Sequence, residues 1–164
     1  MRRVSVWLSV LLLLLAMVAA AHARDDQDAP WGQAQPLPIK YKPAKVLYDV
    51  DTGSAAKLAN ILDRVSLLNR LYGADPFDAR IVVVLHGESI PFFAIANYWE
   101  HKDLMDRAES LTHGDVVEFR MCQAAARGRY GLEAKDIHGF VKMVPMADAE
   151  IVRLQAEEGF AYMR

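Results

Sequence analysis

The fold is decided by residues 81–85, which read IVVVL and are apolar at every position. A strand covered by helices on both faces has such an unbroken apolar run, whereas a strand with one face in water alternates apolar and polar residues. Turn-forming Asp75 and Pro76 precede the run, and His86 and Gly87 follow it. The stretch therefore predicts the central strand of a parallel sheet.

The segments on either side of this run alternate between strand and helix patterns. Before it, residues 46–50 (VLYDV) favour a strand, and residues 55–72 repeat apolar side chains at the three-and-four spacing of one helix face. After it, residues 91–111 have a helical pattern, either continuous or broken near residues 99–102, and residues 116–121 (VVEFRM) predict a third strand. Strands that alternate with helices in this way predict parallel crossover connections.

The last part of the chain continues this alternation. Residues 122–127 predict the first turns of a helix, residues 139–144 a fourth strand, residues 147–157 a final helix, and residues 160–162 a short last strand. The predicted fold class is therefore α/β. We expect a three-layer sandwich around a mainly parallel sheet of about five strands, with a flavodoxin-like topology.

The N-terminus has the three parts of a secretory signal peptide. Arg2 and Arg3 supply the positive start, residues 6–20 are apolar except for Ser9, and residues 21–23 (AHA) fit the small-residue cleavage site. The apolar run is shorter than the roughly 20 residues of a membrane-spanning helix. We therefore expect residues 1–23 to be a cleaved signal and the mature protein to be periplasmic, with no membrane anchor.

The remaining 141 of the 164 residues divide into an arm and one domain. Residues 24–44 contain four prolines with little periodicity, which is typical of an extended arm, and residues 45–164 carry the α/β pattern. Removing the signal takes away two of the 19 basic residues and none of the 21 acidic residues, leaving a formal charge of −4. This charge argues against nucleic acid or an anionic membrane as partner.

Cys122 is the single cysteine, so no disulfide can form within one chain. An odd thiol in an exported protein is buried, paired between chains, or reactive. Cys122 lies where the third strand meets a helix, and free N–H groups at a helix start stabilise thiolate over thiol. Arg120 projects to the same side of the strand, and Arg127 is placed to reach back, so we expect a cationic rim around the thiol.

Three polar or reactive side chains fall at the carboxyl ends of the predicted strands: Asp49, His86 and Cys122. They meet at one sheet edge if the three strands run parallel, and ligands bind at that edge of open α/β sheets. His86 suits acid–base chemistry or anion orientation, or it is simply hydrogen-bonded to its turn. Asp51, Thr52 or Ser54 can cap the helix that follows, and the expected role of Asp49 and Asp51 is helix capping and turn formation.

The sequence predicts no metal and no cofactor. The histidines are scattered with no pair four residues apart, and one thiol is too few for a zinc site. The chain also contains no G-x-G-x-x-G, no P-loop and no G-x-S-x-G motif.

The order of four segments resembles the DsrE/DsrF-like family, and in particular its exported, single-subunit branch. The segments are residues 45–50, 81–87, 117–122 and 144–162. The resemblance implies a five-stranded parallel sheet with helices on both sides and a homo-oligomer, either a trimer or a hexamer. Some relatives carry sulfur as a persulfide on a cysteine, and Cys122 stands at the matching strand-to-helix position.

Two functional hypotheses follow. In the first, the protein handles sulfur in the periplasm as a persulfide carrier or a sulfurtransferase-like protein that uses Cys122 and binds a small sulfur-containing anion. In the second, it is a non-catalytic, homo-oligomeric module that binds a small ligand or a protein, and Cys122 is buried. The expected binding residues are His86, Gly87, Arg120, Arg127 and Asp49. Exposure of the Cys122 thiol distinguishes the two hypotheses.

Overall fold

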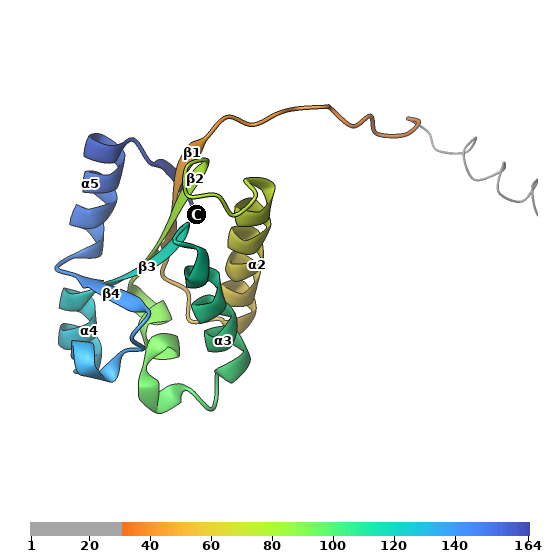
Figure 1. Ribbon diagram of the computed structural model, residues 1–164. Helices are drawn as coiled ribbons and strands as arrows, with labels where there is room; N and C mark the ends of the chain where they lie inside the picture. The colour runs from red at the N-terminus through yellow and green to blue at the C-terminus, as the bar shows by residue number, and fades with distance from the viewer. Residues whose placement is uncertain (1–30) are drawn as a thin grey trace, which may run out of the picture. The chain divides into compact units, whose positions relative to one another are not determined.

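The predicted central strand is β2, Ala79–Leu85, in the computed structural model, which describes residues 31–164 (Figure 1). It pairs in parallel with β1 on one side and β3 on the other. The five-stranded sheet is parallel throughout its registered pairs and has the order β4-β3-β2-β1-β5. The other strands are β1 (Ala44–Val50), β3 (Val117–Cys122), β4 (Val141–Val144) and β5 (Ala161–Met163).

The chain winds in one direction from β1 to β4 and then reverses. Helix α5, Ala147–Glu158, leads back across the sheet and places β5 on the free side of β1. The direction therefore changes once, between β1 and β5. Flavodoxin's order, 2-1-3-4-5, also reverses beside the first strand, but there the outer strand is second in the chain rather than last.

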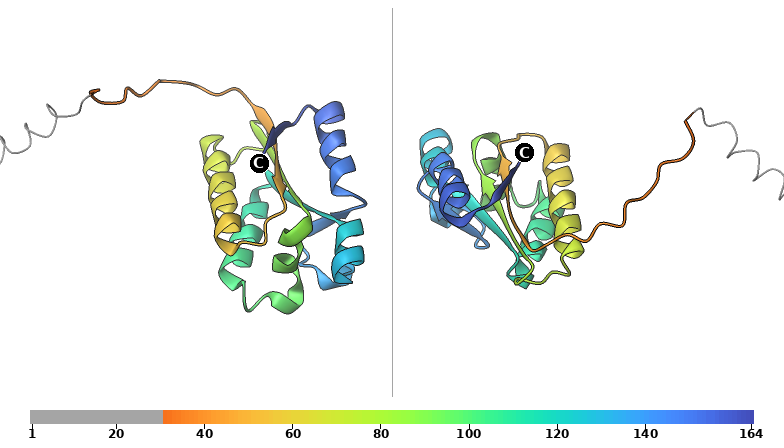
Figure 2. Two further views of the ribbon diagram at one scale, coloured as in Figure 1. Left: turned by 180° about the vertical axis from the view of Figure 1, so that it is seen from behind. Right: turned by 90° about the horizontal axis from the view of Figure 1, so that it is seen from above.

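Helices cover both faces of the sheet, which confirms the predicted α/β sandwich (Figure 2). On one face the larger core joins alternate residues of β1, β2 and β3 to α2 (Ala55–Leu71) and α3 (Lys102–Leu111). On the other face a smaller core joins Leu47, Val82 and Val84 to Leu154 of α5. Right-handed crossovers explain this arrangement, because a reversed winding direction moves the connecting helix to the opposite face.

The connection from β2 to β3 is not one continuous helix over residues 91–111, and only its part after the expected break is α-helical. Two short 3-10 segments, η1 (Gly87–Phe93) and η2 (Ile95–Asn97), come first, and α3 begins only at Lys102. Pro91 has no N–H to donate and disfavours helical backbone in the residue before it. The Asn97 side chain donates a 2.9 Å hydrogen bond to the Pro91 carbonyl, which holds this tighter path.

The remaining elements lie on either side of β3 in the chain, with the 3-10 segment η3 (Thr112–Gly114) before its amino end and helix α4 (Gln123–Tyr130) and the 3-10 segment η4 (Ala134–Asp136) after its carboxyl end. Helix α4 follows β3 directly and contacts η1. Residues 32–43 contain no helix or strand, and the compact unit runs from Tyr41 to Arg164. The predicted signal, residues 1–23, lies outside the described residues. No described helix has the length and apolar character to cross a membrane.

Candidate functional site

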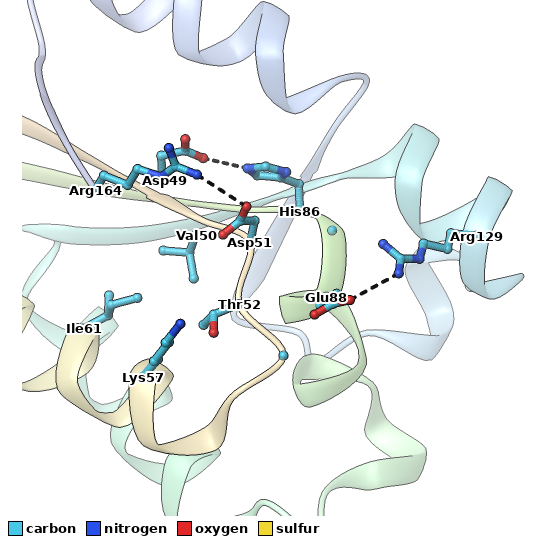
Figure 3. A pocket seen from close by; sticks show the side chains of 12 residues that line it. Asp49, Val50, Asp51, Thr52, Lys57, Ile61, His86, Glu88, Arg129 and Arg164 are labelled. Carbon is cyan, nitrogen blue, oxygen red and sulfur yellow. Dashed lines mark hydrogen bonds and ion pairs between the residues drawn. The ribbon is translucent and has the colours of Figure 1, made fainter.

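A polar pocket of about 590 Å³ opens where the winding direction of the sheet reverses. Its lining comes from the loop after β1, the loop after β2, the first turns of α2, Arg129 of α4 and Arg164 after β5 (Figure 3). In open parallel sheets the carboxyl ends of the strands at such a switch point are the usual ligand site. The pocket therefore lies where this topology usually places a ligand.

Asp49 and His86 form the polar centre of the pocket. The His86 Nε2 atom lies 2.6 Å from one carboxylate oxygen of Asp49, and the Tyr162 hydroxyl donates to the other at 2.5 Å (Figure 3 shows the first pair). The hydrogen bond to Asp49 raises the pKa of Tyr162. Asp49 thus joins side chains from β1, β2 and β5, and its expected capping role is taken by Ser54, whose Oγ accepts the Lys57 N–H.

Two glycines allow the loops after β1 and β2 to pack closely. Gly87 has a φ of +55°, which strains any residue with a Cβ, and a Cβ on Gly53 would lie 2.9 Å from a carboxylate oxygen of Glu88. The Glu88 N–H donates to the Asp51 carbonyl at 3.1 Å, and the Tyr130 hydroxyl donates to the Gly87 carbonyl at 3.0 Å. These bonds hold one wall of the pocket in a fixed shape.

The charges around the pocket are paired except at Lys57. Arg164 lies 3.9 Å from Asp51, and Arg129 lies 3.5 Å from Glu88. Within residues 31–164 the Lys57 ammonium has no ion-pair or hydrogen-bond partner, and Figure 3 shows it reaching toward the pocket beside Thr52. Lys57 lies in the first turn of α2, where unpaired N–H groups and the helix dipole also favour negative charge. The pocket therefore has one wall suited to an anion.

Cys122 lies outside this pocket lining. It is the N-cap of α4, its Sγ accepts the Ala125 N–H at 3.4 Å, and only 5% of the residue is exposed. It packs with Val84 of β2 and Ala147 of α5 in the smaller core. This burial is the feature that the binding-module hypothesis requires.

His86 is nevertheless the neighbour of Cys122 along the sheet edge. Leu85 is registered with Met121, so His86 and Cys122 each directly follow a paired residue of the two neighbouring strands. Both side chains then lie on the α5 face, since side chains alternate along a strand. Within the described part of the chain no hydrogen bond joins them. The parallel strands thus bring Asp49, His86 and Cys122 to one edge.

The expected cationic rim around Cys122 is absent among the described residues, because Arg120 and Arg127 are both paired with carboxylates. Arg120 donates to Glu118 of its own strand and to Glu150 of α5, and this cluster is largely buried. Arg127 donates to Glu133 at 2.7 and 2.8 Å on the surface. Carboxylates therefore neutralise both guanidinium groups. Strand periodicity alone could not predict these pairs, because it does not give the positions of the partner segments.

Several pocket residues were not predicted from the sequence. Lys57 had a usable signal, because it stands in the first turn after a predicted N-cap. Arg129 and Arg164 had none, since their positions depend on where α4 ends and on β5 pairing with β1. Across residues 31–164, no three His, Cys, Asp or Glu side chains gather in a way that suits a metal ion.

The fold and the pocket together define a doubly wound α/β domain with a polar switch-point site. Among solved structures, the chain is similar to MTH1491, a protein of unknown function from Methanobacterium thermoautotrophicum. The two share 22% sequence identity and a TM-score of 0.56, over 74% of this chain and 98% of the other. No protein-family model matches the chain, and no curated protein is significantly similar to it. The structural likeness supports the fold.

Proposed function

We propose that this protein is a binding module for a small anion and that the ligand occupies the switch-point pocket. The observation that carries the proposal is the unpaired Lys57 ammonium in a pocket whose other cations are paired. The pocket volume, about 590 Å³, is within the range of small-molecule sites. A carboxylate or a sulfur oxyanion would gain a charge-assisted hydrogen bond from Lys57 and the partial positive charge of the α2 N-terminus.

The Asp49–His86 pair defines what else the ligand carries. The Asp49 carboxylate can only accept, so His86 Nε2 donates the hydrogen bond between them. A neutral His86 therefore has its proton on Nε2, and its Nδ1 is free to accept a hydrogen bond. A ligand that combines a negative charge with a hydrogen-bond donor satisfies both Lys57 and His86. A hydroxycarboxylate such as lactate belongs to this class, whereas thiosulfate and sulfate carry no proton at neutral pH and would pair with Lys57 alone.

Isothermal titration calorimetry of residues 24–164 tests this proposal. The panel is thiosulfate, sulfate, lactate and, as the uncharged control, propane-1,2-diol, at constant ionic strength. We expect saturable binding of at least one of the anions and none of the diol. Equal heats for charged and uncharged compounds, or no saturation in the millimolar range, would contradict an anion site.

A second candidate function, sulfur carriage on Cys122, is favoured by the thiol's place at the α4 N-terminus beside His86. Serine, threonine and aspartate are the usual N-caps, so cysteine is an unusual choice for capping alone. The Ala125 N–H donates to Sγ and would stabilise a thiolate. That thiolate would attack the outer sulfur of thiosulfate, forming a Cys122 persulfide and releasing sulfite with the electron pair of the broken S–S bond.

Mass spectrometry after incubation with thiosulfate distinguishes sulfur carriage from simple binding. If Cys122 carries sulfur, the protein gains the mass of one sulfur atom, and dithiothreitol removes it. Cys122→Ser is the matched control, since serine keeps the N-cap hydrogen bond and should fold normally. An unmodified thiol that also resists iodoacetamide in the folded protein would leave Cys122 as a buried core residue.

Export to the periplasm and assembly into a trimer or hexamer stay predictions. Three large apolar side chains are exposed on separate segments: Phe77 before β2 is 90% exposed, Trp99 between η2 and α3 81%, and Val152 of α5 64%. Exposed apolar groups that gather in a patch mark interaction surfaces, whereas single ones are ordinary. A homo-oligomer would cover part of this surface.

A further inference from the structure

A second pocket, of about 400 Å³, lies between α3 and the segment that enters β4. Tyr98 and Phe140 supply aromatic walls, Met105 is apolar, and Asp106 and Glu109 of α3 bring two carboxylates. It shares no lining residue with the switch-point pocket. Its chemistry is also opposite, because acidic and aromatic groups replace the unpaired ammonium.

His138 forms a fixed part of this pocket wall. Its ring stacks on Phe140 with the centroids 5.8 Å apart and the planes 12° from parallel, and it meets the Tyr98 ring edge-on at 5.6 Å. The backbone N–H of His138 donates to the Phe93 carbonyl at 3.1 Å, and its carbonyl accepts from the Val141 N–H at 3.0 Å. Stacking and backbone bonds therefore hold the imidazole in one orientation.

The Nε2 atom of His138 is buried and has no hydrogen-bond partner within the described chain. Buried side-chain nitrogen atoms are nearly always paired, so this one marks a place where a polar group is missing. Burial lowers the pKa of His138, so the imidazole is neutral near pH 7 and one of its nitrogens is an acceptor. A ligand N–H at this point would complete the hydrogen bonding.

The charges at the rim favour a cation. Asp106 is balanced by Lys102, and it also accepts from the Tyr98 hydroxyl at 2.9 Å. Glu109 has only His113 beside it, at 2.8 Å, so no permanent cation offsets its charge. The Lys102 ammonium lies 5.8 Å from the Tyr98 ring centroid, a cation–π distance. The aromatic wall thus already attracts a positive charge.

We propose that this second pocket binds a small organic ammonium ion. Its N–H donates to Nε2 of His138, its hydrocarbon part packs against Tyr98 and Phe140, and its charge is balanced by Glu109. Aromatic walls with a carboxylate nearby are a common way to recognise such cations. This site is independent of the anion pocket, so either proposal can fail without the other.

Titration with benzylamine, followed by NMR or calorimetry, tests the proposal, with benzyl alcohol as the uncharged ligand of the same shape. We expect benzylamine to bind about tenfold or more tightly than the alcohol. His138→Phe keeps the ring stack but removes the nitrogen, and it should weaken benzylamine about tenfold. Lys42→Met is the control, because Lys42 is exposed and lines neither pocket, and it should leave benzylamine affinity unchanged.

Glu109→Gln keeps the test valid if His138→Phe fails to fold, because Glu109 is on the exposed surface of α3. It should lower the preference for benzylamine over benzyl alcohol by about threefold or more. Equal affinity for the two ligands, no saturation in the millimolar range, or an unchanged preference in both variants would overturn the proposal.

Discussion

Replacing Arg120 with methionine is expected to lower the free energy of unfolding by about 3 kcal/mol. The Arg120 side chain is 12% exposed and donates to Glu118 and to Glu150, whose side chain is 10% exposed. Removing one partner of a buried ion pair leaves the other charges poorly solvated. The expected loss is at the low end of the usual range, because Lys142 still contacts Glu118 and Arg153 still contacts Glu150.

Urea unfolding of the wild type and the variant at pH 7 measures this loss. Arg127→Met is the matched control, since Arg127 has the same charge and pairs with Glu133 on the surface. An exposed pair contributes little, so the control should lose less than about 1 kcal/mol. Equal losses of unfolding free energy in the two variants would mean that the Arg120 cluster stabilises the fold no more than a surface ion pair does.

The penalty for losing Arg120 should shrink in acid. Hydrogen bonds from Arg153 and Arg120 lower the pKa of Glu150; burial acts to raise the pKa of Glu118, but bonds from Arg120 and Lys142 outweigh it. A carboxyl with a lowered pKa stabilises the fold fully above its ordinary pKa and loses this contribution as the pH falls through the folded value. The difference in the free energy of unfolding between the wild type and the Arg120→Met variant should therefore shrink below pH 4.

Replacing Lys57 with methionine is expected to weaken anion binding about tenfold or more. A hydrogen bond to a charged group contributes about 1.5 to 3 kcal/mol, and 1.4 kcal/mol corresponds to a factor of ten in affinity. Lys57 is exposed, and methionine forms helix about as readily as lysine, so the fold should be unaffected. Calorimetric titration with the anion that binds the wild type measures the change.

Lys135→Met controls for the general loss of one positive charge. Lys135 is an exposed residue of η4 and does not line the pocket. It should leave the anion affinity within about twofold of the wild type, because salt screens an exposed charge that does not contact the ligand. Equal weakening by both variants would show that the anion responds to net charge rather than to Lys57.

The sheet and its order of elements could largely be predicted, because these depend on local patterns. The unbroken run at residues 81–85 indicated a strand covered on both sides, and the spacing of apolar residues in α2 gave its bounds almost to the residue. The β2–β3 connection was less predictable. Residues 91–101 contain buried aromatic side chains that fit a helix pattern, and Pro91 directs them into tighter turns.

The candidate site was predictable only where it lies at the ends of the strands. Asp49, His86 and Cys122 follow from strand ends and the parallel direction. The contact of Asp49 with Tyr162, 113 positions later, and that of Arg120 with Glu150 depend on the return of α5 across the sheet. The burial of Cys122 has the same origin, since Ala147 of α5 packs in its core cluster.

The most direct test of the central claim is to locate the bound anion in the ¹⁵N–¹H correlation spectrum of residues 24–164. If the switch-point pocket is the site, a saturating titration with the best anion shifts the amide signals of Gly53, Lys57 and Gly87 most strongly, and Lys57→Met removes these shifts. Binding at this pocket is contradicted if the largest saturating shifts lie away from the loops after β1 and β2, or if they persist unchanged in Lys57→Met.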